Sequence, residues 1–354
     1  MRKYLVLAPD AFADDAKTAH GVIRYGEDET VAVIDPTLAG KRVCDVAPHL
    51  GSDAPIVASV AEGLAYGPTA LLIGTAPQGG RLPPSWRAEI LAAIAAGLEI
   101  VSGLHDMLRD DVAFAAAARA AGTSIWDVRE PPEVPLFSGA AYDVAPPVLL
   151  LAGNDCAVGK MTVALELCAA AATRGSKAAF VPTGQTGIMI AGWGIAVDRV
   201  ISDFAAGAAE QLVLYAAESA PDLIVVEGQG AINHPAYAPV TLSLLYGTAP
   251  DALVLVCEVP HASIPTFGTP VLGYERLIAL HEALLATVKP ARVVGIALNT
   301  RAIASDDAAR REIARARAET GLPADDVVRF GCIALYDAIV PSITKRRPLS
   351  EVPV

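Results

Sequence analysis

The chain lacks the features that mark several large protein classes. Its five cysteines form no CxxC pair, so neither a disulfide framework nor a zinc site is indicated. It contains no uncharged apolar run of about 18 residues, which argues against a membrane-spanning segment. Basic residues are outnumbered, because 27 Lys and Arg against 39 Asp and Glu give a net charge of −12. A general affinity for nucleic acid or anionic lipid is therefore not expected.

Charged residues of both signs are scarce, at 19% of the 354 residues, whereas hydrophobic residues reach 53%. Together with a mean hydropathy of +0.43, this composition indicates extensively buried strands or a large subunit interface. The apolar run that follows the first basic residues is too short for the core of a signal peptide. We therefore expect a cytoplasmic protein that forms a homo-oligomer.

The length of the chain allows two domains. A proline-rich stretch, Arg129–Pro147, marks their boundary, and we predict domains at 1–135 and 136–354. In the first domain short apolar strands alternate with helices, but no GxGxxG occurs, so a Rossmann-like domain without the dinucleotide fingerprint is predicted. Its loop Thr75–Pro84 suits a pyrophosphate or adenosine-bearing ligand, and a plain connecting loop is the alternative.

One stretch of the second domain has the layout of a phosphate-binding loop. An apolar strand, Val148–Ala152, runs into the turn GNDCAVG and then into a helix that starts near Lys160. Backbone N–H groups and the helix dipole surround an anion in such a turn, and the lysine adds a full charge. We predict that a phosphate-bearing cofactor is bound in this loop by Gly153, Asn154, Asp155, Cys156, Ala157, Val158, Gly159, Lys160, Met161 and Thr162.

This loop departs from the common form of the motif. Five residues separate its glycines, and Met161 follows the lysine where a Ser or Thr usually supplies a hydroxyl to Mg²⁺. A thioether is a poor ligand for that hard cation. Hydrolysis of ATP is therefore less favoured than the binding of a phosphate that is not transferred. No metal site is predicted.

Other runs of the second domain are almost continuously apolar, as strands covered by helices on both faces require. These runs are Asp222–Val226, Ala252–Cys257 and Val293–Leu298. The expected fold is therefore α/β, with the Rossmann-like domain followed by a doubly wound, parallel-sheet domain of the P-loop NTPase-like kind. A helix is expected over Asp306–Thr320 and a closing strand near Val327–Phe330, while Thr183–Gly194 is expected to form a glycine-rich loop.

Two polar residues near the end of one of these strands are candidate catalytic groups. Glu227 directly follows the run DLIVV, where a carboxylate could hold Mg²⁺ or accept a proton from a substrate amine. The alternative for Glu227 is a pairing with Lys160 or a backbone amide. His234 lies in the loop that follows and is the histidine best placed to meet a ligand, although a structural role is the alternative. We predict that Glu227 or His234 is the catalytic base.

Further polar residues are candidates for substrate and cofactor contacts. Gln185 and Thr186 in the glycine-rich loop could hydrogen-bond substrate, or the loop could be a mobile connector. Arg199 and Arg301 could clamp substrate carboxylates, or Arg199 could pair with its acidic neighbours. Asn299 follows a late strand and could read the edge of an adenine, or it could lead a turn.

Several phrases of the sequence resemble known families. GNDCAVGK, VEGQG and the late Asn299 resemble the corresponding parts of dethiobiotin synthetase, a P-loop enzyme. AVIDPTLAGK, GLHDML, GNDCAVGKMT, PTGQTGIMIAGWG, VEGQGAINHPAY and GIALNTR together resemble a family once of unknown function, whose characterised members are the DgcN-type D-glutamate N-acetyltransferases. This resemblance implies transfer of acetyl from acetyl-CoA to the amine of D-glutamate or a similar acidic amino acid.

Two other functions remain open at this point. The first is an ATP- and Mg²⁺-dependent ligase or kinase of the dethiobiotin-synthetase type, and Met161 is the residue that argues against it. The second is a nucleotide-binding regulatory protein, which the loop alone would satisfy. For acetyl-CoA, the loop TAPQGG also resembles CoA-binding Rossmann domains, so either domain could receive the acetyl donor.

Overall fold

The computed structural model describes residues 1–343 except 76, 78 and 266, and the chain forms two compact units. The N-terminal unit comprises residues 1–130 and 185–196, and the C-terminal unit begins at 131 and contains the rest. Two parallel sheets of six strands, one in each unit, confirm the predicted fold class. The predicted boundary after residue 135 stays a prediction. The compact units divide after residue 130, and the segment 185–196 belongs to the N-terminal unit although it lies later in the chain.

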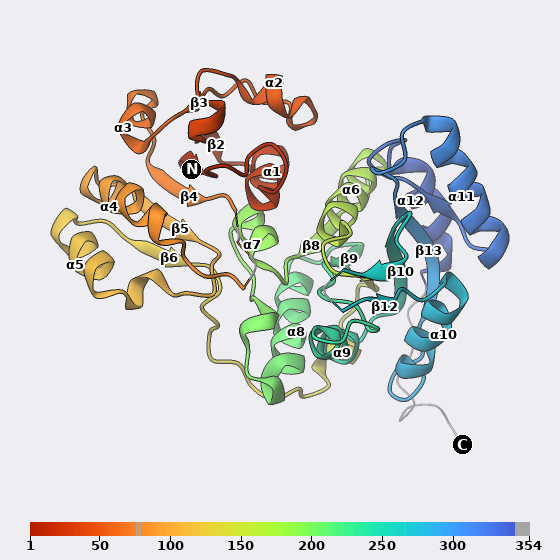
Figure 1. Cartoon of the computed structure of the whole chain (residues 1–354). Helices are drawn as coiled ribbons and strands as arrows, with labels where there is room; N and C mark the ends of the chain where they lie inside the picture. The colour runs from red at the N-terminus through yellow and green to blue at the C-terminus, as the bar shows by residue number, and fades with distance from the viewer. Residues whose placement is uncertain (76, 78, 266, 344–354) are drawn as a thin grey trace. The chain divides into compact units, whose positions relative to one another are not determined.

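The N-terminal unit has the strand order β3-β2-β1-β4-β5-β6, which is that of a Rossmann fold (Figure 1). All its strand pairs are parallel. Its strands are β1 (Lys3–Leu7), β2 (Glu29–Ile34), β3 (Ile56–Val57), β4 (Ala70–Ile73), β5 (Glu99–Ser102) and β6 (Ile125–Asp127). Its helices are α1 (Lys17–Tyr25), α2 (Val43–Val46), α3 (Val60–Gly63), α4 (Arg87–Ala95), α5 (Val112–Ala121) and α7 (Gln185–Ala191).

The central strand β1 shows why this sheet is apolar throughout. Tyr4 and Val6 belong to one core cluster, and Leu5 and Leu7 belong to another. Successive side chains of a strand point to opposite faces, so both faces of β1 are buried under helices. The near-continuous apolar run in the sequence follows from this double burial.

Helix α7 corrects the expectation that Thr183–Gly194 is a loop. Its residues Ile188 and Met189 are buried in the same core cluster as Tyr4 and Val6. Helix α7 lies against α1 in the N-terminal unit (Figure 1). The segment is helical because its apolar residues complete the core of a sheet that lies earlier in the chain, and local glycine content does not reveal this contact.

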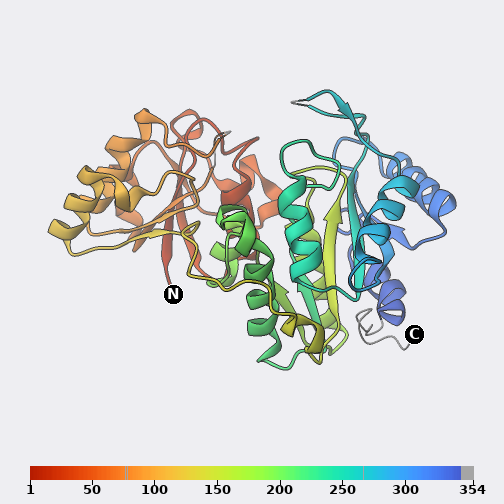
Figure 2. The same ribbon diagram turned by 90° about the horizontal axis from the view of Figure 1, so that it is seen from below.

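The C-terminal unit has the strand order β14-β13-β10-β7-β9-β8, again with parallel pairs. Its strands are β7 (Val148–Gly153), β8 (Ala178–Val181), β9 (Leu223–Val226), β10 (Ala252–Glu258), β13 (Arg292–Asn299) and β14 (Ala324–Asp325), with a separate antiparallel hairpin of β11 (Ser263–Ile264) and β12 (Thr269–Pro270). Its helices are α6 (Lys160–Thr173), α8 (Ser202–Ala217), α9 (Ala238–Gly247), α10 (Tyr274–Leu285), α11 (Asp306–Thr320) and α12 (Ile333–Ile339). Figure 2 shows helices on both sides of this sheet and the hairpin extending from it.

The expected strand over Val327–Phe330 is wrong. The last strand, β14, is Ala324–Asp325, and the chain turns directly after it. The turn forms because Asp326 Oδ1 accepts hydrogen bonds from the N–H groups of Val328 and Arg329, at 3.1 and 3.0 Å. An Asp side chain that bonds its own backbone two residues on favours a turn over a sheet ladder.

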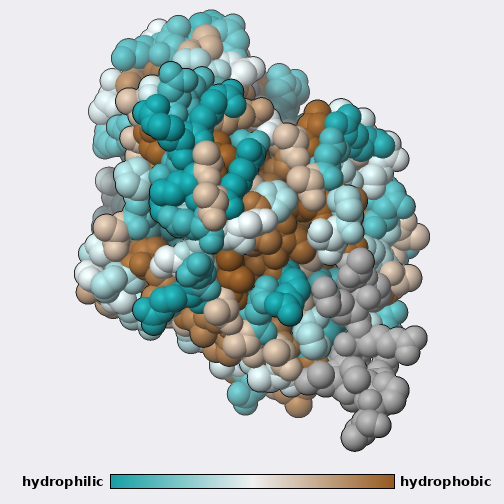
Figure 3. Space-filling view, turned by 90° about the vertical axis from the view of Figure 1, so that its right-hand side faces the viewer, coloured by the Kyte–Doolittle hydropathy of each residue, from teal (hydrophilic) through white to brown (hydrophobic). Residues whose placement is uncertain are grey.

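The surface carries both polar and apolar residues. Helix α11 is exposed over most of its length and buries only Ala309, Ile313 and Ala316. Figure 3 shows one face of the molecule, on which hydrophobic residues gather between hydrophilic ones. Within the described part of the chain, no helix has the length and apolar character needed to span a membrane.

Candidate functional site

The phosphate-loop motif lies between the end of β7 and the start of α6. Gly153 lets the lysine pack closely, because a Cβ there would lie 3.0 Å from Lys160 Nζ and the ammonium would have to shift. Gly159 has φ +110°, a conformation that favours glycine. The buried Lys160 donates from Nζ to the backbone oxygen of Asp155, 2.7 Å away. The glycines therefore permit a tight loop that curls around the lysine ammonium.

Two asparagines fasten this loop to neighbouring strands. Asn154 Oδ1 accepts from the N–H of Glu258, and its Nδ2 donates to the carbonyl of Glu258, both at 3.2 Å. Asn299 Nδ2 donates to the carbonyl of Val158 at 3.1 Å, and its Oδ1 accepts from the N–H of Arg301 at 3.2 Å. Asn299, predicted to bind the cofactor, thus holds the loop through Nδ2 and its own turn through Oδ1, and its contact with a cofactor stays a prediction.

Met161 and Thr162 occupy the first turn of α6. Met161 is buried and Thr162 is half-buried. The position after the lysine therefore holds a thioether in place of the hydroxyl that coordinates nucleotide-bound Mg²⁺. The start of α6 still offers N–H groups and a positive dipole end to an anion. Phosphate binding fits this loop better than magnesium-assisted phosphoryl transfer does.

Glu227 directly follows β9 and is buried. Its Oε2 accepts hydrogen bonds from the N–H groups of Thr183 and Gly184, at 3.1 and 3.2 Å. Thr183 Oγ1 in turn donates to the backbone carbonyl of Glu227 at 2.8 Å. One carboxylate oxygen of Glu227 is therefore used to join the ends of β8 and β9, which is the backbone-amide alternative considered above. A catalytic role for Glu227 stays a prediction.

A cluster of ionisable side chains surrounds Asp155 in the loop. His261 Nε2 lies 2.7 Å from Asp155 Oδ2, and His234 Nε2 lies 3.9 Å from Asp155 Oδ1. Asp155 Oδ1 also accepts from the N–H of Cys156 at 2.6 Å. The side chains of Asp155, His234 and His261 are 7%, 5% and 14% exposed. The phosphate loop thus carries a nearly buried carboxylate between two imidazoles.

The hydrogen bonds of His234 determine which of its nitrogens carries the proton. Nδ1 accepts from the N–H groups of Ala236 and Tyr237, at 3.1 and 3.2 Å. A nitrogen that accepts has no proton, so the neutral ring carries its proton on Nε2 and presents an N–H group toward Asp155. In its neutral form His234 is therefore arranged as a hydrogen-bond donor at Nε2, and its catalytic role stays a prediction.

The same tautomer bears on metal binding. Asp155, Cys156 and His234 each have a potential ligand atom within 4.8 Å of the others, which is the residue set of a metal site. A neutral histidine that ligates a metal through Nε2 needs its proton on Nδ1, and that proton usually goes to an acceptor. In His234 the atoms facing Nδ1 are donors. The residues present do not fit a metal ligated by His234.

Aromatic rings and one amide complete the surroundings of His234. The ring centroid of Tyr237 lies 4.6 Å from that of His234, and the ring centroid of Phe267, from the β11–β12 hairpin, lies 5.5 Å from it. Asn233 has both polar atoms of its amide buried without a hydrogen-bond partner among the described residues. An unsatisfied buried amide is costly, so Asn233 offers one donor and one acceptor to a bound molecule.

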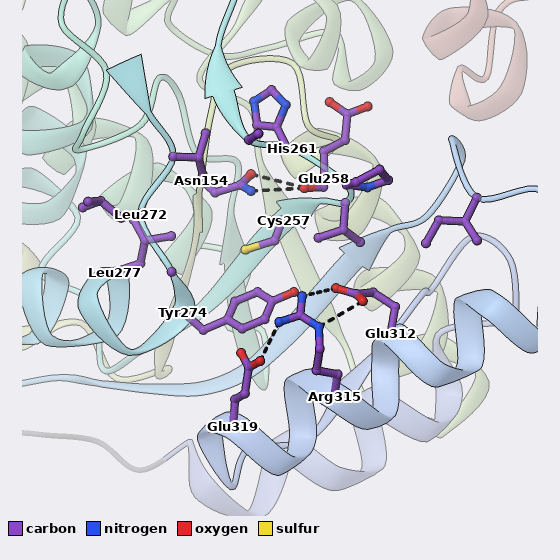
Figure 4. Close-up of a pocket in the computed structure, with 16 residues that line it drawn as sticks. Asn154, Cys257, Glu258, His261, Leu272, Tyr274, Leu277, Glu312, Arg315 and Glu319 are labelled. Carbon is purple, nitrogen blue, oxygen red and sulfur yellow. Dashed lines mark hydrogen bonds and ion pairs between the residues drawn. The ribbon is translucent and has the colours of Figure 1, made fainter. Parts of the chain in front are cut away.

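A cavity of about 490 Å³ opens beside the loop, at the end of β10. Figure 4 shows His261 and Glu258 at one end of this cavity, and Arg315 between Glu312 and Glu319 at the other. Arg315 Nε donates to Glu312 at 3.0 Å, which leaves the guanidinium paired within the protein. The end of the cavity that meets the phosphate loop therefore carries the imidazole of His261.

The four residues predicted to bind substrate fall in both units. Gln185 and Thr186 belong to α7 in the N-terminal unit, where Gln185 Oε1 accepts from Arg129 Nε at 2.6 Å and Thr186 Oγ1 lies 3.1 Å from Thr18 Oγ1. These bonds fasten α7 to its unit. In the C-terminal unit, Arg199 is exposed and Arg301 Nε donates to Glu258 at 2.8 Å. Contact of these four side chains with substrate stays a prediction.

His261 is the site residue that sequence patterns alone did not identify. It follows strand β10 by only three residues, and the carboxyl ends of parallel strands are where ligands bind in such sheets. This position just after a strand is the sequence signal that could have identified His261. The contact with Asp155, which lies 106 residues earlier, depends on β10 pairing directly with β7.

Two domain families match the chain. Residues 36–131 match a Rossmann-like domain and residues 135–336 match a P-loop domain, which are the N-terminal and C-terminal domains of one family of unknown function. The protein is thus of the class that joins a Rossmann-like unit to a P-loop unit. The chain belongs to the DUF1611 family, and the family membership predicted from its motifs is confirmed.

Individual relatives cover nearly the whole chain. The crystal structure of a DUF1611 family protein from Anabaena variabilis ATCC 29413 matches with a TM-score of 0.91 and 38% identity, over 96% of this chain and 100% of that one. A curated relative from Tritonibacter scottomollicae, named D-glutamate N-acetyltransferase, is 36% identical over 94% of this chain and 96% of its own length. A second one of the same name, from a Pseudoalteromonas species, is 36% identical over 80% of this chain and 84% of its own length.

Proposed function

We propose that the protein is an N-acetyltransferase that moves acetyl from acetyl-CoA to the amine of D-glutamate or a similar acidic amino acid. The names of the two curated relatives, which match most of this chain, support the reaction class. The observation in this chain that carries the proposal is the phosphate loop with Met161 in place of a hydroxyl residue. Such a loop can hold the phosphates of a carrier without the magnesium ligand that triphosphate hydrolysis needs.

The loop fits a CoA phosphate in three respects. It has a glycine with φ +110° at the helix start, a lysine ammonium inside the loop and the start of a helix directed at the same place. Coenzyme A carries a pyrophosphate and a 3′-phosphate, either of which could occupy the loop. Lys160 would then leave the carbonyl of Asp155 and pair with the phosphate, a charge-assisted bond that is stronger than its present one.

Acetyl transfer to an amine also needs a donor for the oxyanion and a group that removes a proton. Arg199 and Arg301 are our candidates for the carboxylates of the amino acid, since a guanidinium binds a carboxylate through two parallel hydrogen bonds. Glu227 and His234 stay our candidates for the group that removes the proton.

The test is a calorimetric titration with acetyl-CoA and, separately, with ATP and Mg²⁺. We expect acetyl-CoA to bind, and we expect Lys160→Met to weaken its binding by about 10- to 100-fold, because a hydrogen bond to a charged group contributes about 1.5–3 kcal/mol. Lys41→Met, at an exposed lysine of the N-terminal unit, is the matched control and should bind as the wild type does. Binding of ATP that depends on Mg²⁺, with no binding of acetyl-CoA, would instead favour a ligase or kinase.

The acceptor is identified by release of the CoA thiol in the presence of D- and L-amino acids. We expect release with D-glutamate and much less with L-glutamate. A homo-oligomer in the cytoplasm is part of the same proposal, and light scattering after size-exclusion chromatography would give the number of subunits.

A further inference from the structure

The cavity of about 490 Å³ at the end of β10 shares a wall with the phosphate loop. Its volume is in the range of small-molecule sites, roughly 300–1,000 Å³. Asn154 of the loop, Cys257 of β10, Tyr274 of α10 and Arg315 of α11 all line it (Figure 4). From this geometry we infer that the cavity is the adenine subsite of the acetyl donor, and that the hydroxyl of Tyr274 hydrogen-bonds the base. The inference rests on the proposed function, which gives the phosphates of the donor to the loop.

The cavity and the loop are neighbours because β7 and β10 pair in the sheet. Gly153, where the loop begins, is paired with Val256, and Cys257 directly follows Val256. Burial raises the pKa of the Cys257 thiol to about 12, and the Lys160 ammonium acts against that rise, so the loop lysine and the cavity wall are close enough to interact. In coenzyme A the adenosine is joined directly to the phosphates, whereas the acetyl group lies a pantetheine arm away. Of these two ends, the adenosine is the one that a cavity beside the loop can receive.

The charges at the α11 side of the cavity favour an uncharged group. Arg315 lies between two carboxylates there, with its Nε 3.0 Å from Glu312 and its Nη1 2.5 Å from Glu319. One guanidinium is thus matched by two carboxylates, and this part of the wall carries a net negative charge. A phosphate, or an acidic amino acid with its two carboxylates, would be repelled here. A neutral nucleobase meets no such repulsion.

Tyr274 supplies an unused hydrogen-bonding group in the same wall. The residue is 7% exposed, and its hydroxyl is buried without a hydrogen-bond partner among the residues that the structure describes. Burial raises the pKa of Tyr274, so the hydroxyl keeps its proton near neutral pH and can both donate and accept. A buried hydroxyl without a partner costs free energy, and a bound base that supplies the partner removes that cost.

The side chains around Tyr274 suit the faces and the edge of a planar base. Leu272, Leu277 and Ile303 also line the cavity. Figure 4 shows Tyr274 reaching from α10 toward Arg315, whose guanidinium carbon lies 5.6 Å from the centroid of the Tyr274 ring. The side chain of Arg315 is 50% exposed, so it can shift on its long stem and open the hydroxyl to a ligand. Apolar side chains and guanidinium planes stack on nucleobases, and the edge of adenine offers both an acceptor and a donor to the hydroxyl.

The experiment measures the binding of ADP, 4′-phosphopantetheine and inorganic pyrophosphate by calorimetry. All three probes carry phosphate for the loop, but only ADP carries adenine. Tyr274→Phe removes the hydroxyl and keeps the ring, so we expect it to weaken ADP binding by about 3- to 10-fold and to leave the other two probes unchanged. Lys160→Met should weaken the binding of all three. Tyr4→Phe is the matched control, because Tyr4 of the N-terminal unit also has a buried hydroxyl that bonds no described residue, and it should bind ADP as the wild type does.

Two further measurements separate a contact with the base from a change in folding. Because the hydroxyl that is removed has no partner, Tyr274→Phe should resist urea at least as well as the wild type. Nuclear Overhauser contacts between the adenine protons of ADP and the methyl groups of Leu277 should locate the base in the cavity, and they decide the question if the variant is less stable.

ADP binding by Tyr274→Phe within twofold of the wild type overturns the inference. Contacts of Leu277 with phosphopantetheine in place of adenine also overturn it, because the cavity would then hold the other half of the donor. Binding of ADP that depends on Tyr274, in a protein that does not bind acetyl-CoA, would overturn the proposed function while supporting an adenine site in the cavity.

Discussion

Both units bury acidic side chains next to their parallel strands, but among the described residues only the C-terminal unit pairs some of them with other ionisable side chains. In the N-terminal unit, Asp35 and Asp127 accept hydrogen bonds from backbone N–H groups of adjoining turns. In the C-terminal unit, Asp155 is bonded to His261, and Asp251 Oδ1 lies 2.8 Å from Lys289 Nζ. Buried carboxylates that bond backbone N–H groups thus occur in both units, as Glu227 and Asp326 show for the C-terminal one. Among the described residues, buried carboxylates that contact ionisable side chains occur in the C-terminal unit.

This difference indicates where chemistry can occur. A backbone N–H cannot change its protonation, so a carboxylate bonded to it only holds a turn in place. Burial raises the pKa of Asp127, and its backbone donors offset that effect only in part. A carboxylate bonded to an imidazole can instead fix a tautomer and stabilise a charge that appears during a reaction. The proposed acyl transfer is placed in the C-terminal unit for this reason.

The largest expected effect on stability comes from the buried ion pair of the C-terminal unit. The side chains of Lys289 and Asp251 are 1% and 0% exposed. Asp251 also accepts from the N–H of Val148, at the start of β7. Lys289→Met leaves this carboxylate without its ammonium in a buried position, so we expect the free energy of unfolding to fall by about 3–5 kcal/mol. Denaturant unfolding measures the loss, and hydrogen exchange assigns it to a unit.

The control for this variant is Arg174→Met, which breaks an ion pair with Asp337 that is exposed to water on both sides. Exposed pairs contribute little, so Arg174→Met should unfold nearly as the wild type does. Equal losses in the two variants would show that burial does not distinguish the ion pairs of this unit. Loss of protection in β1 and β4 as well as in β7 and β10 would show that the two units unfold together, and the comparison would then fail.

The next effect concerns how tightly the chain packs around one glycine within each unit. A Cβ on Gly228, beside Glu227, would lie 1.6 Å from the backbone oxygen of Leu151 in β7. A Cβ on Gly63 in the N-terminal unit would meet only the end of the Leu5 side chain, at 2.5 Å. Backbone cannot move aside as a side chain can. We therefore expect Gly228→Ala to cost about 3 kcal/mol or more and Gly63→Ala about 1 kcal/mol, as measured by urea unfolding.

A larger loss of stability in Gly63→Ala than in Gly228→Ala would contradict the close approach of Gly228 to β7. Activity gives a second measurement, because Gly228 lies beside the strand that leads into the phosphate loop. Gly228→Ala should lower the rate of thiol release by more than its unfolded fraction explains, whereas Gly63→Ala should not.

Local patterns predicted much of the fold, and distant contacts explain the failures. Strand β5 and helix α11 begin and end where the sequence indicated, and the side chain of Ser305 and the left-handed Gly321 cap α11. The segment 185–191 was missed as a helix because Ile188 and Met189 pack on strands more than 100 residues earlier. No local pattern carries information about such a partner.

The same distinction between local patterns and distant contacts applies to the residues of the site. The phosphate loop is a local motif, so its glycines and Lys160 were identified from spacing. The pairing of Asp155 with His261 depends on the order of β7 and β10 in the sheet. The tautomer of His234 depends on two backbone N–H groups whose direction only coordinates give. Residue types could therefore be predicted, but the contacts of the two imidazoles with Asp155 could not.

The smallest expected effect concerns a carboxylate of the N-terminal unit, Asp111, which caps helix α5. Its Oδ1 accepts from the N–H groups of Ala113 and Phe114, at 3.0 and 3.2 Å. The hydrogen bond from Arg87 lowers the pKa of Asp111 from 3.8 to about 2. Because the folded pKa lies below the unfolded one, the stabilisation is present above about pH 4 and is lost as the pH falls toward 2.

Asp111→Ala should therefore lower the free energy of unfolding by about 1 kcal/mol at neutral pH, the usual contribution of an N-cap. Asp111→Asn should lose much less, since an amide oxygen can still accept from the helix N–H groups. Urea unfolding at neutral pH and at about pH 3 would test both statements, because the difference between wild type and Asp111→Ala should shrink at the lower pH. A difference that stays constant would mean that the charge of Asp111 adds nothing to its cap. Asp111 would then stabilise its helix through hydrogen-bond geometry alone, as Asp35 and Asp127 hold their turns, and the contrast with the charged partners of Asp155 and Asp251 would become sharper.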